Sequence, residues 1–391
     1  MTIRGYRRAD GGKGIRNHLL VVYLVECAHH VAREVAEPFL DQGVQVIGFP
    51  NCYPCAHAER MLGRLCTHPN VAGALLVSLG CEGFGKSSLA AVTAGSGRPV
   101  ETLTIQRAGG TLRTIEAGRS WVREALAAMQ ETPRADLSPA DLTVAVMAGD
   151  ARAPAAPAVR GMLEAAGARL VSQGGRVILA DALANAGPEA ALADRAFSPR
   201  LRMEIGAAME KAARYRAIQA ELLEPAETPL GPAPAMRQTT SAIAISGLLK
   251  PGDVPPGTGL YLLDSVPDGE VRFGVFDLNE NVAMGEAASC GAHLILYWTE
   301  RGSAAGSAIA PVIKLCGDSD TFGRLREDLD IDAGRLGAGL SAAAELTSEI
   351  VDRVIRVAGG EPSAAEALGH REFTLTYKSF APSGPACLPT I

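Results

Sequence analysis

Apolar runs of strand length alternate along this chain with segments whose apolar residues recur at helical spacing, and no other feature restricts the fold as much. The run at 18–25 is followed by a segment of helical spacing and then by a second apolar run at 44–49. Strands that alternate with helices predict parallel sheets with right-handed crossovers. The expected fold class is therefore α/β, with two or three doubly wound, mostly parallel α/β units. Further strands are expected at 71–79, 143–147, 176–180, 260–266, 293–298, 309–315 and 373–377.

Proline-containing connectors suggest how these units are divided. One connector occupies 131–140, and a Pro/Ala-rich loop occupies 224–238. We therefore expect three domains. They are an N-terminal α/β domain at 1–135, a middle α/β domain with a long helix and the Pro-rich loop at 136–240, and a C-terminal α/β domain at 241–391.

The composition argues against several classes of protein. The chain has 391 residues, of which 47% are hydrophobic, so it can bury a large core. A net charge of −6 does not suit a nucleic-acid partner, which favours a basic face. No apolar run is long enough for a membrane helix, and the N-terminal residues contain no apolar signal core. Eight widely spaced cysteines are typical of reduced thiols, so we expect a cytoplasmic protein.

The segment after the predicted strand 293–298 has the character of a binding site. It is the turn 299–303, and ligands of α/β proteins lie outside the carboxyl ends of strands. Gly302 frees the backbone to approach a small anion, and the planar fork of Arg301 matches a carboxylate or sulfonate. Lys314 lies near the end of the next apolar run. These groups would suit a small polyoxygenated acid; the alternative is a surface salt bridge for Arg301 and a lysine that reaches out to solvent.

Cysteines follow two of the predicted strands in the first third of the chain. Cys52 and Cys55 come after the run at 44–49, and Cys81 comes after the run at 71–79. The Cys-x-x-Cys pair could be a redox pair or half of a zinc site, but no second pair of similar spacing follows. Thiolates at the edge of one sheet could also bind another soft or borderline metal. Buried cysteines that act only as small hydrophobic residues are the remaining interpretation.

The turn and its surroundings resemble the C-terminal signature of the altronate/galactarate dehydratase family, which also contains the large subunit of sulfolactate sulfo-lyase. That signature is a T-x-R-G-S-x-x-G turn, a P-x-I-K strand and an acidic D-x-D-I-x-x-G segment. The matching residues are Thr299, Arg301, Gly302, Ser303, Gly306, Pro311, Ile313, Lys314, Asp328, Asp330, Ile331 and Gly334. The N-terminal motif of the family is matched by Gly5, Tyr6, Arg8, Asp10, Gly11, Gly14, Arg16 and Asn17. Its L-G-C-E motif is matched at 79–82.

Three loops depart from the family pattern. The cysteine turn at 49–55 lacks the family's histidine, the C-G-G-S-D loop is replaced at 148–154, and the loop with paired acids and a lysine is reduced to remnants within 229–247. These loops would contact the leaving group or a metal. The departures therefore leave open a change of substrate or a loss of catalysis.

The resemblance implies a lyase large subunit that takes the proton next to the carboxylate of a sugar acid, or of another hydroxy acid, and expels water from the β position. Catalytic roles are implied for Lys314, Arg301 and Glu82. Substrate contacts are implied for Arg16, Asn17, Thr299, Gly302 and Ser303. Metal ligation is implied for Cys52 and Cys81, with Fe²⁺ as the expected divalent metal and Mn²⁺, Mg²⁺ or Zn²⁺ as alternatives. Lys314 could serve as the base if burial lowers its pKa.

The resemblance also implies a partner. Relatives carry a small N-terminal domain or a separate small subunit before the part that this chain matches, so we expect a small partner subunit or domain, and a homo-oligomer. Two other functions stay open. One is a sulfo-lyase that acts on sulfolactate, and the other is a non-catalytic acid-binding or assembly relative with altered active-site loops.

Overall fold

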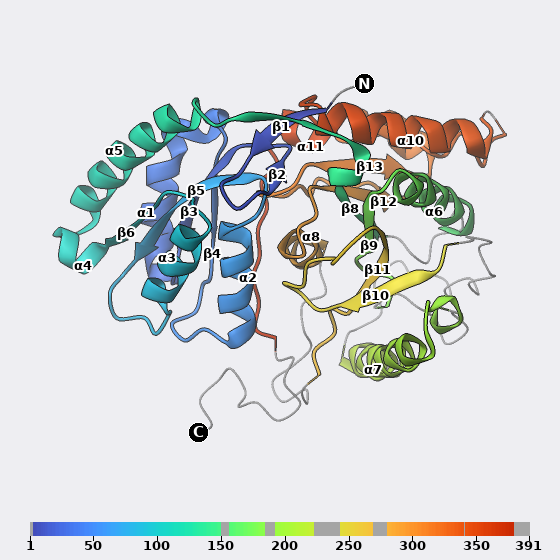
Figure 1. Ribbon diagram of the computed structural model, residues 1–391, viewed down its shortest axis with the longest axis horizontal. Coiled ribbons are helices and arrows are strands. Elements are labelled where there is room, and N and C mark those ends of the chain that lie inside the picture. Colours follow the sequence, from blue (N-terminus) through green and yellow to red (C-terminus); the bar gives the residue numbers. More distant parts are fainter. Residues whose placement is uncertain are drawn as a thin grey trace.

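The computed structural model describes residues 3–149, 156–183, 192–222, 243–268, 280–339 and 341–378. Within these residues two parallel sheets, each flanked by helices, lie beside one another (Figure 1). This arrangement confirms the expected α/β class. Of the loops 148–154 and 229–247, which depart from the family pattern, residues 150–154 and 229–242 lie outside the described residues.

The first sheet has four parallel strands in the order β4-β3-β5-β6. The strands are β3 (His18–Tyr23), β4 (Val44–Gly48), β5 (Val71–Ser78) and β6 (Val100–Thr104). Every residue of β5 is buried, because helices cover both faces of the sheet and a strand between them needs a continuous apolar run. One face is covered by α1 (Glu26–Ala36) and α5 (Thr111–Met129), and the other by α2 (Ala56–Cys66) and α3 (Lys86–Gly95). The short helices η1 (Glu37–Gln42) and α4 (Ile105–Ala108) complete this unit.

The second sheet has seven parallel strands in the order β10-β11-β9-β8-β12-β13-β14. The strands are β8 (Thr143–Ala148), β9 (Arg176–Leu179), β10 (Ile245–Leu249), β11 (Gly259–Leu263), β12 (Leu294–Thr299), β13 (Val312–Cys316) and β14 (Ile331–Asp332). The chain builds one side of the sheet from β8 to β11, with β11 inserted between β9 and β10, and then returns to β12 on the other side of β8. The point where the strand order reverses therefore lies between β8 and β12, the usual place for a ligand in such sheets.

Helices cover both faces of the second sheet as well. One face packs against α6 (Ala156–Ser172), α7 (Pro199–Leu222) and α10 (Ala343–Ala358). The other packs against α8 (Glu280–Ser289) and α11 (Ala364–Leu368). The short helices η2 (Pro139–Asp141), η3 (Ala193–Arg195) and α9 (Ser319–Arg324) lie in connections. Strands of the expected middle and C-terminal domains thus share one sheet, and the three domain limits stay a prediction.

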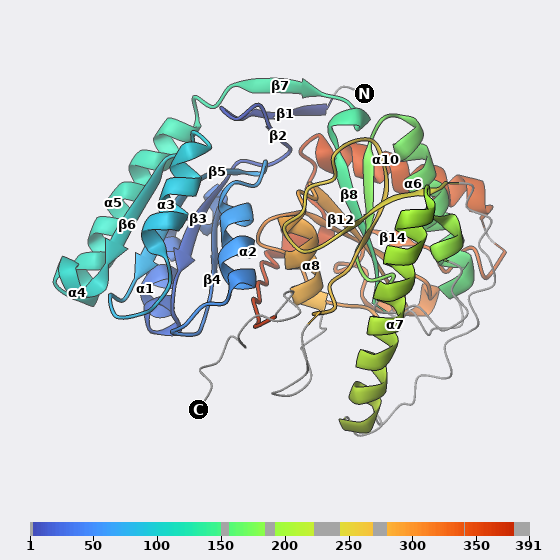
Figure 2. The ribbon, with the colours of Figure 1, turned by 60° about the horizontal axis from the view of Figure 1, so that its bottom comes forward.

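A small antiparallel sheet, in the order β2-β1-β7, bridges the two units along one side of the molecule (Figure 2). It consists of β1 (Ile3–Arg7), β2 (Lys13–Gly14) and β7 (Arg134–Leu137). Because β1 pairs with β7, the first residues of the chain hold the connector between the two larger sheets in place.

The two units meet where α2 packs against α8, and the segment 369–378 runs between them (Figure 1). The strand expected at 373–377 is wrong: these residues pair with no strand. Leu375 is buried in the core between the units, and Phe373 and Tyr377 pack against the same core, so this segment fills a seam rather than extending a sheet. Of the helices in the described part of the chain, none combines the length and apolar character that a bilayer crossing requires.

Candidate active site

The turn after β12 is held in shape by two of the predicted site residues. The hydroxyl of Thr299 accepts a hydrogen bond from the backbone N–H of Gly302 at 3.0 Å. Gly302 has a φ of +86°, and a Cβ there would collide with the side chain of Leu325, so only glycine suits the turn. Arg301, between them, lies on the exposed side of the turn. Thr299 and Gly302 therefore shape the turn, and their predicted contact with substrate stays a prediction.

Lys314 lies on β13 directly opposite Tyr297 of β12, and its side chain is fully buried. Its Nζ donates to the carbonyl oxygen of Ser303 at 2.9 Å, which joins the buried amine to the turn. Burial lowers the pKa of Lys314 below its usual value, although nearby carboxylates act in the opposite direction. Those carboxylates belong to Asp328, Asp330, Glu372 and Glu280. An amine with a lowered pKa is suited to accept a proton, as predicted for a base.

Glu280, which the sequence analysis did not single out, is the third member of this site. It is the first residue of α8, and its carboxylate accepts hydrogen bonds from the hydroxyl of Ser303, at 2.9 Å, and from the hydroxyl of Tyr297. Gly149, just after β8, approaches Tyr297 so closely that a Cβ would collide with that hydroxyl. In sequence, a glutamate at the start of a helix looks like an ordinary response to the helix dipole, so no local signal marks it.

The carboxylate of Asp330 is held by groups other than Arg301. Arg353 forms an ion pair with it at 2.8 Å, and the backbone N–H groups of Lys314 and Ala364 donate to it at 2.8 and 3.0 Å. The Asp330 side chain is fully buried. The acidic segment that follows the lysine strand thus anchors α10 and α11 to β13.

The two cysteine turns of the first sheet touch one another. The backbone N–H of Gly83 donates to the carbonyl oxygen of Cys52 at 2.8 Å, so the turns after β4 and β5 meet at the carboxyl edge of this sheet. Cys52 and Cys81 are exposed, whereas Cys55 is buried. Across the described ranges, no group of three or more His, Cys, Asp or Glu side chains could hold a metal ion. Two thiols make at most half of a tetrahedral site, so the residues present do not form a complete centre.

Glu82 is held within its own turn. Its carboxylate accepts hydrogen bonds from the hydroxyl of Ser78 and, at 2.8 Å, from the backbone N–H of Gly80. Burial raises the pKa of Glu82, but these bonds outweigh it and leave the pKa below its usual value. Glu82 is thus an ionised carboxylate at the edge of the first sheet, whereas Lys314 belongs to the second sheet. Its catalytic role stays a prediction.

Arg16 and Asn17 stand just before β3, and the structure gives both of them structural partners. Arg16 forms a two-pronged ion pair with Glu366, at 2.7 and 2.8 Å, and also donates to the carbonyl oxygen of Val357 at 2.9 Å. Asn17 accepts a hydrogen bond from Arg8 at 2.6 Å. These contacts tie the N-terminal motif to α10 and α11. The structure therefore does not bring Arg16 or Asn17 to the turn after β12, and their contact with substrate stays a prediction.

A second group of charged side chains, also unmarked in the sequence, lies buried between the two units. The amine of Lys378 donates to the carboxylate of Glu286 on α8 and, at 3.1 Å, to the carbonyl oxygen of Ser265. His57 on α2 lies 3.7 Å from the same carboxylate. Burial, then the charge of Lys378, lowers the pKa of His57 to about 3, and burial raises the pKa of Glu286 despite Lys378. Beside this group, two lysines pair with two aspartates. Lys211 of α7 and Lys250, just after β10, both form ion pairs with Asp264 and Asp268, which follow β11.

Known proteins resemble this chain over almost its full length. The family model described as D-galactarate dehydratase/altronate hydrolase, second domain, matches residues 5–130, and the model described as D-galactarate/altronate dehydratase, C-terminal, matches residues 235–380. The (2R)-sulfolactate sulfo-lyase subunit beta of Chromohalobacter salexigens is 25% identical over 96% of this chain and 97% of its own length. The altronate dehydratase of Escherichia coli is 24% identical over 95% of this chain and 76% of its own length. That of Bacillus subtilis is 22% identical over 92% and 74%. Together with the turn, the lysine strand and the acidic segment, these matches show that the chain belongs to the altronate/galactarate dehydratase family.

Proposed function

We propose that this chain is the large subunit of a lyase that eliminates the β substituent of a small hydroxy acid. The observation that carries the proposal is the buried amine of Lys314, with its lowered pKa, joined to the turn that presents Arg301. The names of the relatives, two dehydratases and a sulfo-lyase subunit, support the same class of reaction.

Arg301 and Ser303 of the turn, Lys314 of β13 and Glu280 of α8 each have a part in the proposed elimination. Arg301 binds the carboxylate, which fixes the adjacent carbon toward Lys314. The amine of Lys314 takes the proton from that carbon and becomes an ammonium, which returns the proton to the β hydroxyl as the bond from carbon to that hydroxyl breaks, so that the hydroxyl leaves as water. The product is an enol that becomes a keto acid. Ser303 and Glu280, already hydrogen-bonded to one another, orient the hydroxyl groups of the substrate.

A divalent metal, with Fe²⁺ expected first, is part of the proposal as a separate component. Such an ion would neutralise the negative charge that develops on the substrate oxygens. Cys81 and Cys52 are its proposed ligands because their turns meet at one sheet edge. Among the described residues these two thiols do not make a complete centre.

A small partner subunit and a homo-oligomer are further parts of the proposal. The partner is supported by the name of one relative, a subunit beta, with which this chain shares nearly its whole length. The same relative favours a second candidate reaction, the release of sulfite from sulfolactate. Both reactions need the same base and the same carboxylate clamp, so the product identifies the leaving group.

The test is a turnover assay on anaerobically purified protein, alone and with any small chain that co-purifies. Keto-acid formation is measured from a panel of sugar acids, and sulfite release from sulfolactate, with the metal content determined on the same samples. We expect Lys314→Met to lower kcat at least about a hundredfold, because a general base supplies that much. The matched control Lys13→Met removes a lysine that is ion-paired with Asp141 and should leave kcat unchanged.

Two outcomes would contradict the proposal. Full activity in Lys314→Met would remove this lysine as the base, and no product from any acid with metal-loaded wild type would favour the acid-binding alternative. A metal content below about a tenth of an equivalent, unchanged by Cys81→Ser, would remove the thiol-bound metal, because a site with soft ligands should retain its ion during purification.

A further inference from the structure

The buried amine of Lys314 is connected, through the turn after β12, to side chains of two other elements. Its Nζ donates to the carbonyl oxygen of Ser303 at 2.9 Å, and the hydroxyl of Ser303 donates to one carboxylate oxygen of Glu280, also at 2.9 Å. The second carboxylate oxygen of Glu280 accepts the hydroxyl of Tyr297. Tyr297, Glu280 and Ser303 thus form a brace that joins β12 and the start of α8 to the amine on β13.

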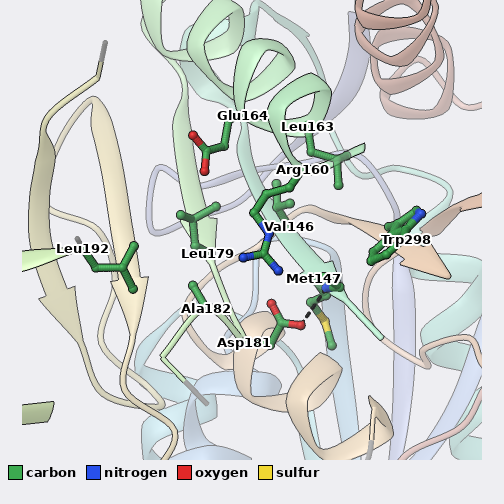
Figure 3. A pocket seen from close by; sticks show the side chains of 11 residues that line it. Val146, Met147, Arg160, Leu163, Glu164, Leu179, Asp181, Ala182, Leu192 and Trp298 are labelled. Atoms are coloured by element: carbon green, nitrogen blue, oxygen red, sulfur yellow. Dashed lines mark hydrogen bonds between the residues drawn. The ribbon is translucent and has the colours of Figure 1, made fainter. Parts of the chain in front are cut away.

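The brace and the amine share one face of the second sheet. Tyr297 and Lys314 are paired in the register of β12 and β13, and paired residues of neighbouring strands point to the same face. Tyr297 belongs to the core under α8. The next residue, Trp298, points to the opposite face, where it lines a small cavity under α6 (Figure 3). The hydroxyl of Tyr297 and the amine of Lys314 therefore both lie under α8, whose first residue is Glu280.

The backbone of Gly149 fixes the position of the Tyr297 hydroxyl. A Cβ at Gly149 would collide with that hydroxyl, so the glycine backbone lies directly against it. The loop that carries Gly149 is itself held on two sides. The N–H of Gly149 donates to the carbonyl oxygen of Trp298 at 2.9 Å, and the N–H of Ala148 donates to the carboxylate of Asp181 at 2.6 Å (Figure 3). Since Tyr297 is also buried, its hydroxyl cannot turn to solvent.

Four carboxylates act through their charge on the amine of Lys314. They come from the segment before β14, from α8 and from the segment 369–378, and they are Asp328, Asp330, Glu280 and Glu372. Asp330 is paired with Arg353 of α10, and Glu366 of α11, which also packs against β13, is paired with Arg16. The carboxylate at the start of α8 is instead held by two hydroxyl groups, which leave its negative charge in place.

We propose that Tyr297 and Glu280 are positioning residues for Lys314, an inference that rests on the proposed function, in which Lys314 is the base. The hydroxyl of Tyr297 fixes the carboxylate of Glu280, the carboxylate fixes Ser303, and the carbonyl oxygen of Ser303 holds the amine in place. The carboxylate of Glu280 also stabilises the ammonium that forms when the amine takes up a proton. Burial weakens the amine as a base, and this charge restores part of its strength.

The titration of the amine tests this positioning without any turnover. NMR of the full-length chain with ¹³C-labelled lysine follows the protonation of each amine, and Lys314→Met identifies the resonance of Lys314. Glu280→Gln removes a negative charge near the amine, so it should move the midpoint of the Lys314 titration to lower pH. The control Glu26→Gln changes the first residue of α1, the matching helix position in the first unit, and should leave the midpoint unchanged. If Glu280 only stabilised the fold, its loss would admit water and move the midpoint to higher pH.

Steady-state kinetics against pH test the same residues in the proposed reaction. In Glu280→Gln the acidic limb of kcat/KM should move in the same direction as the titration, because that limb reports the free base. Tyr297→Phe keeps the charge of the brace but removes one hydrogen bond to its carboxylate, so it should lower kcat about tenfold and leave KM and the pH limb unchanged. The control Tyr261→Phe removes a hydroxyl of the same sheet that donates to the carbonyl oxygen of Gly257, and should keep the wild-type kcat.

The inference is overturned if Glu280→Gln leaves the midpoint of Lys314 unchanged or raises it, or if Tyr297→Phe turns over substrate like wild type. Absence of turnover in wild type would contradict the proposed function, and the NMR titration then decides the inference by itself. Melting curves of every variant show whether the fold is intact. If Glu280→Gln does not fold, Glu280→Asp, which keeps the charge and shortens the reach to Ser303, takes its place. It should lower kcat while the midpoint stays as in wild type, and an unchanged kcat would overturn the inference.

Discussion

Arg301 stands on the exposed side of the turn after β12, while its neighbours Thr299 and Gly302 hold that turn closed. The buried carboxylate that could have been its structural partner, Asp330, is paired with Arg353 instead. If Arg301 serves the site, its replacement should affect ligand binding more than folding, whereas a structural role predicts a loss of stability as well. Measuring both separates a role in the site from a structural role.

Arg301→Lys should keep the charge and lose the planar fork, which weakens the binding of a substrate acid by roughly 1.5–3 kcal/mol. Arg301→Ala should lose at least as much. Titrations of both variants with hydroxy acids, together with melting curves, measure the two effects separately. Arg324→Lys, which changes a nearby exposed arginine bonded to Thr321, is the control. Equal acid affinity in wild type and both Arg301 variants would take this residue out of the site.

At the scale of elements, the segment 369–378 acts as a strap between the two units. Tyr377 stacks edge-on against Phe49 and donates to the carbonyl oxygen of Tyr53 at 2.7 Å. The thiol of Cys55 donates to the carbonyl oxygen of Lys378 at 3.6 Å. The strap therefore joins the cysteine turn of the first unit to Glu286 on α8 of the second, with no strand pairing of its own.

Lys378→Met should destabilise the protein by about 3–5 kcal/mol, because it leaves the carboxylate of Glu286 buried without its cation. Burial raises the pKa of Glu286, so the orphaned group can take up a proton, and the loss should be larger at pH 8 than at pH 5. Denaturant unfolding at both pH values measures this. The double variant with Glu286→Gln should recover part of the loss, and Arg200→Met, which breaks an exposed pair, is the control. A loss that is small at both pH values would contradict the role of the strap.

At the scale of the whole molecule, buried side chains join the two units at the amino ends of their strands. The amide of Asn70 donates to the carbonyl oxygens of His293 and Ile309, at 2.9 and 3.1 Å. His68 contacts the carbonyl oxygen of Ala292 with one ring nitrogen and accepts the backbone N–H of Asn70 with the other. His293 likewise lies between the carbonyl oxygen of Lys13 and the backbone N–H of Thr143. Each ring thus needs one unprotonated nitrogen.

Stability should therefore fall as the pH is lowered below about 6.5, the usual pKa of histidine. Burial lowers the pKa of His57 to about 3, of His293 to about 4, and of His68 well below its usual value. Between these values and 6.5 the unfolded chain binds protons that the folded chain cannot. The cost is up to about 1.4 kcal/mol per histidine per pH unit. Denaturant unfolding between pH 7.5 and 5 measures the slope. His293→Gln should reduce the slope of stability against pH. The control His30→Gln, which changes an exposed histidine, should leave the slope unchanged. A stability that does not vary with pH in wild type would contradict this role of the buried histidines.

The α/β class, the parallel strands and the turn after β12 follow from the amino-acid sequence alone. Strands buried on both faces must be continuous apolar runs, and a turn such as 299–303 needs glycine where φ is positive. Both features can therefore be recognised from a short stretch of sequence. The family motifs are local for the same reason. The domain limits, by contrast, rested on proline-rich connectors, and connectors do not specify that β8 and β9 join the sheet of β10–β14.

Which distant groups meet depends on the packing of the whole chain. Arg16 pairs with Glu366, 350 residues away. Glu280 reaches Tyr297 and Ser303 because α8 starts beside the end of β12. Such pairs follow no periodicity and no fixed spacing, because a charged residue that becomes buried looks the same in the sequence as one that stays exposed. Their partners are set by the packing of α2 against α8 and by the position of the strap between them.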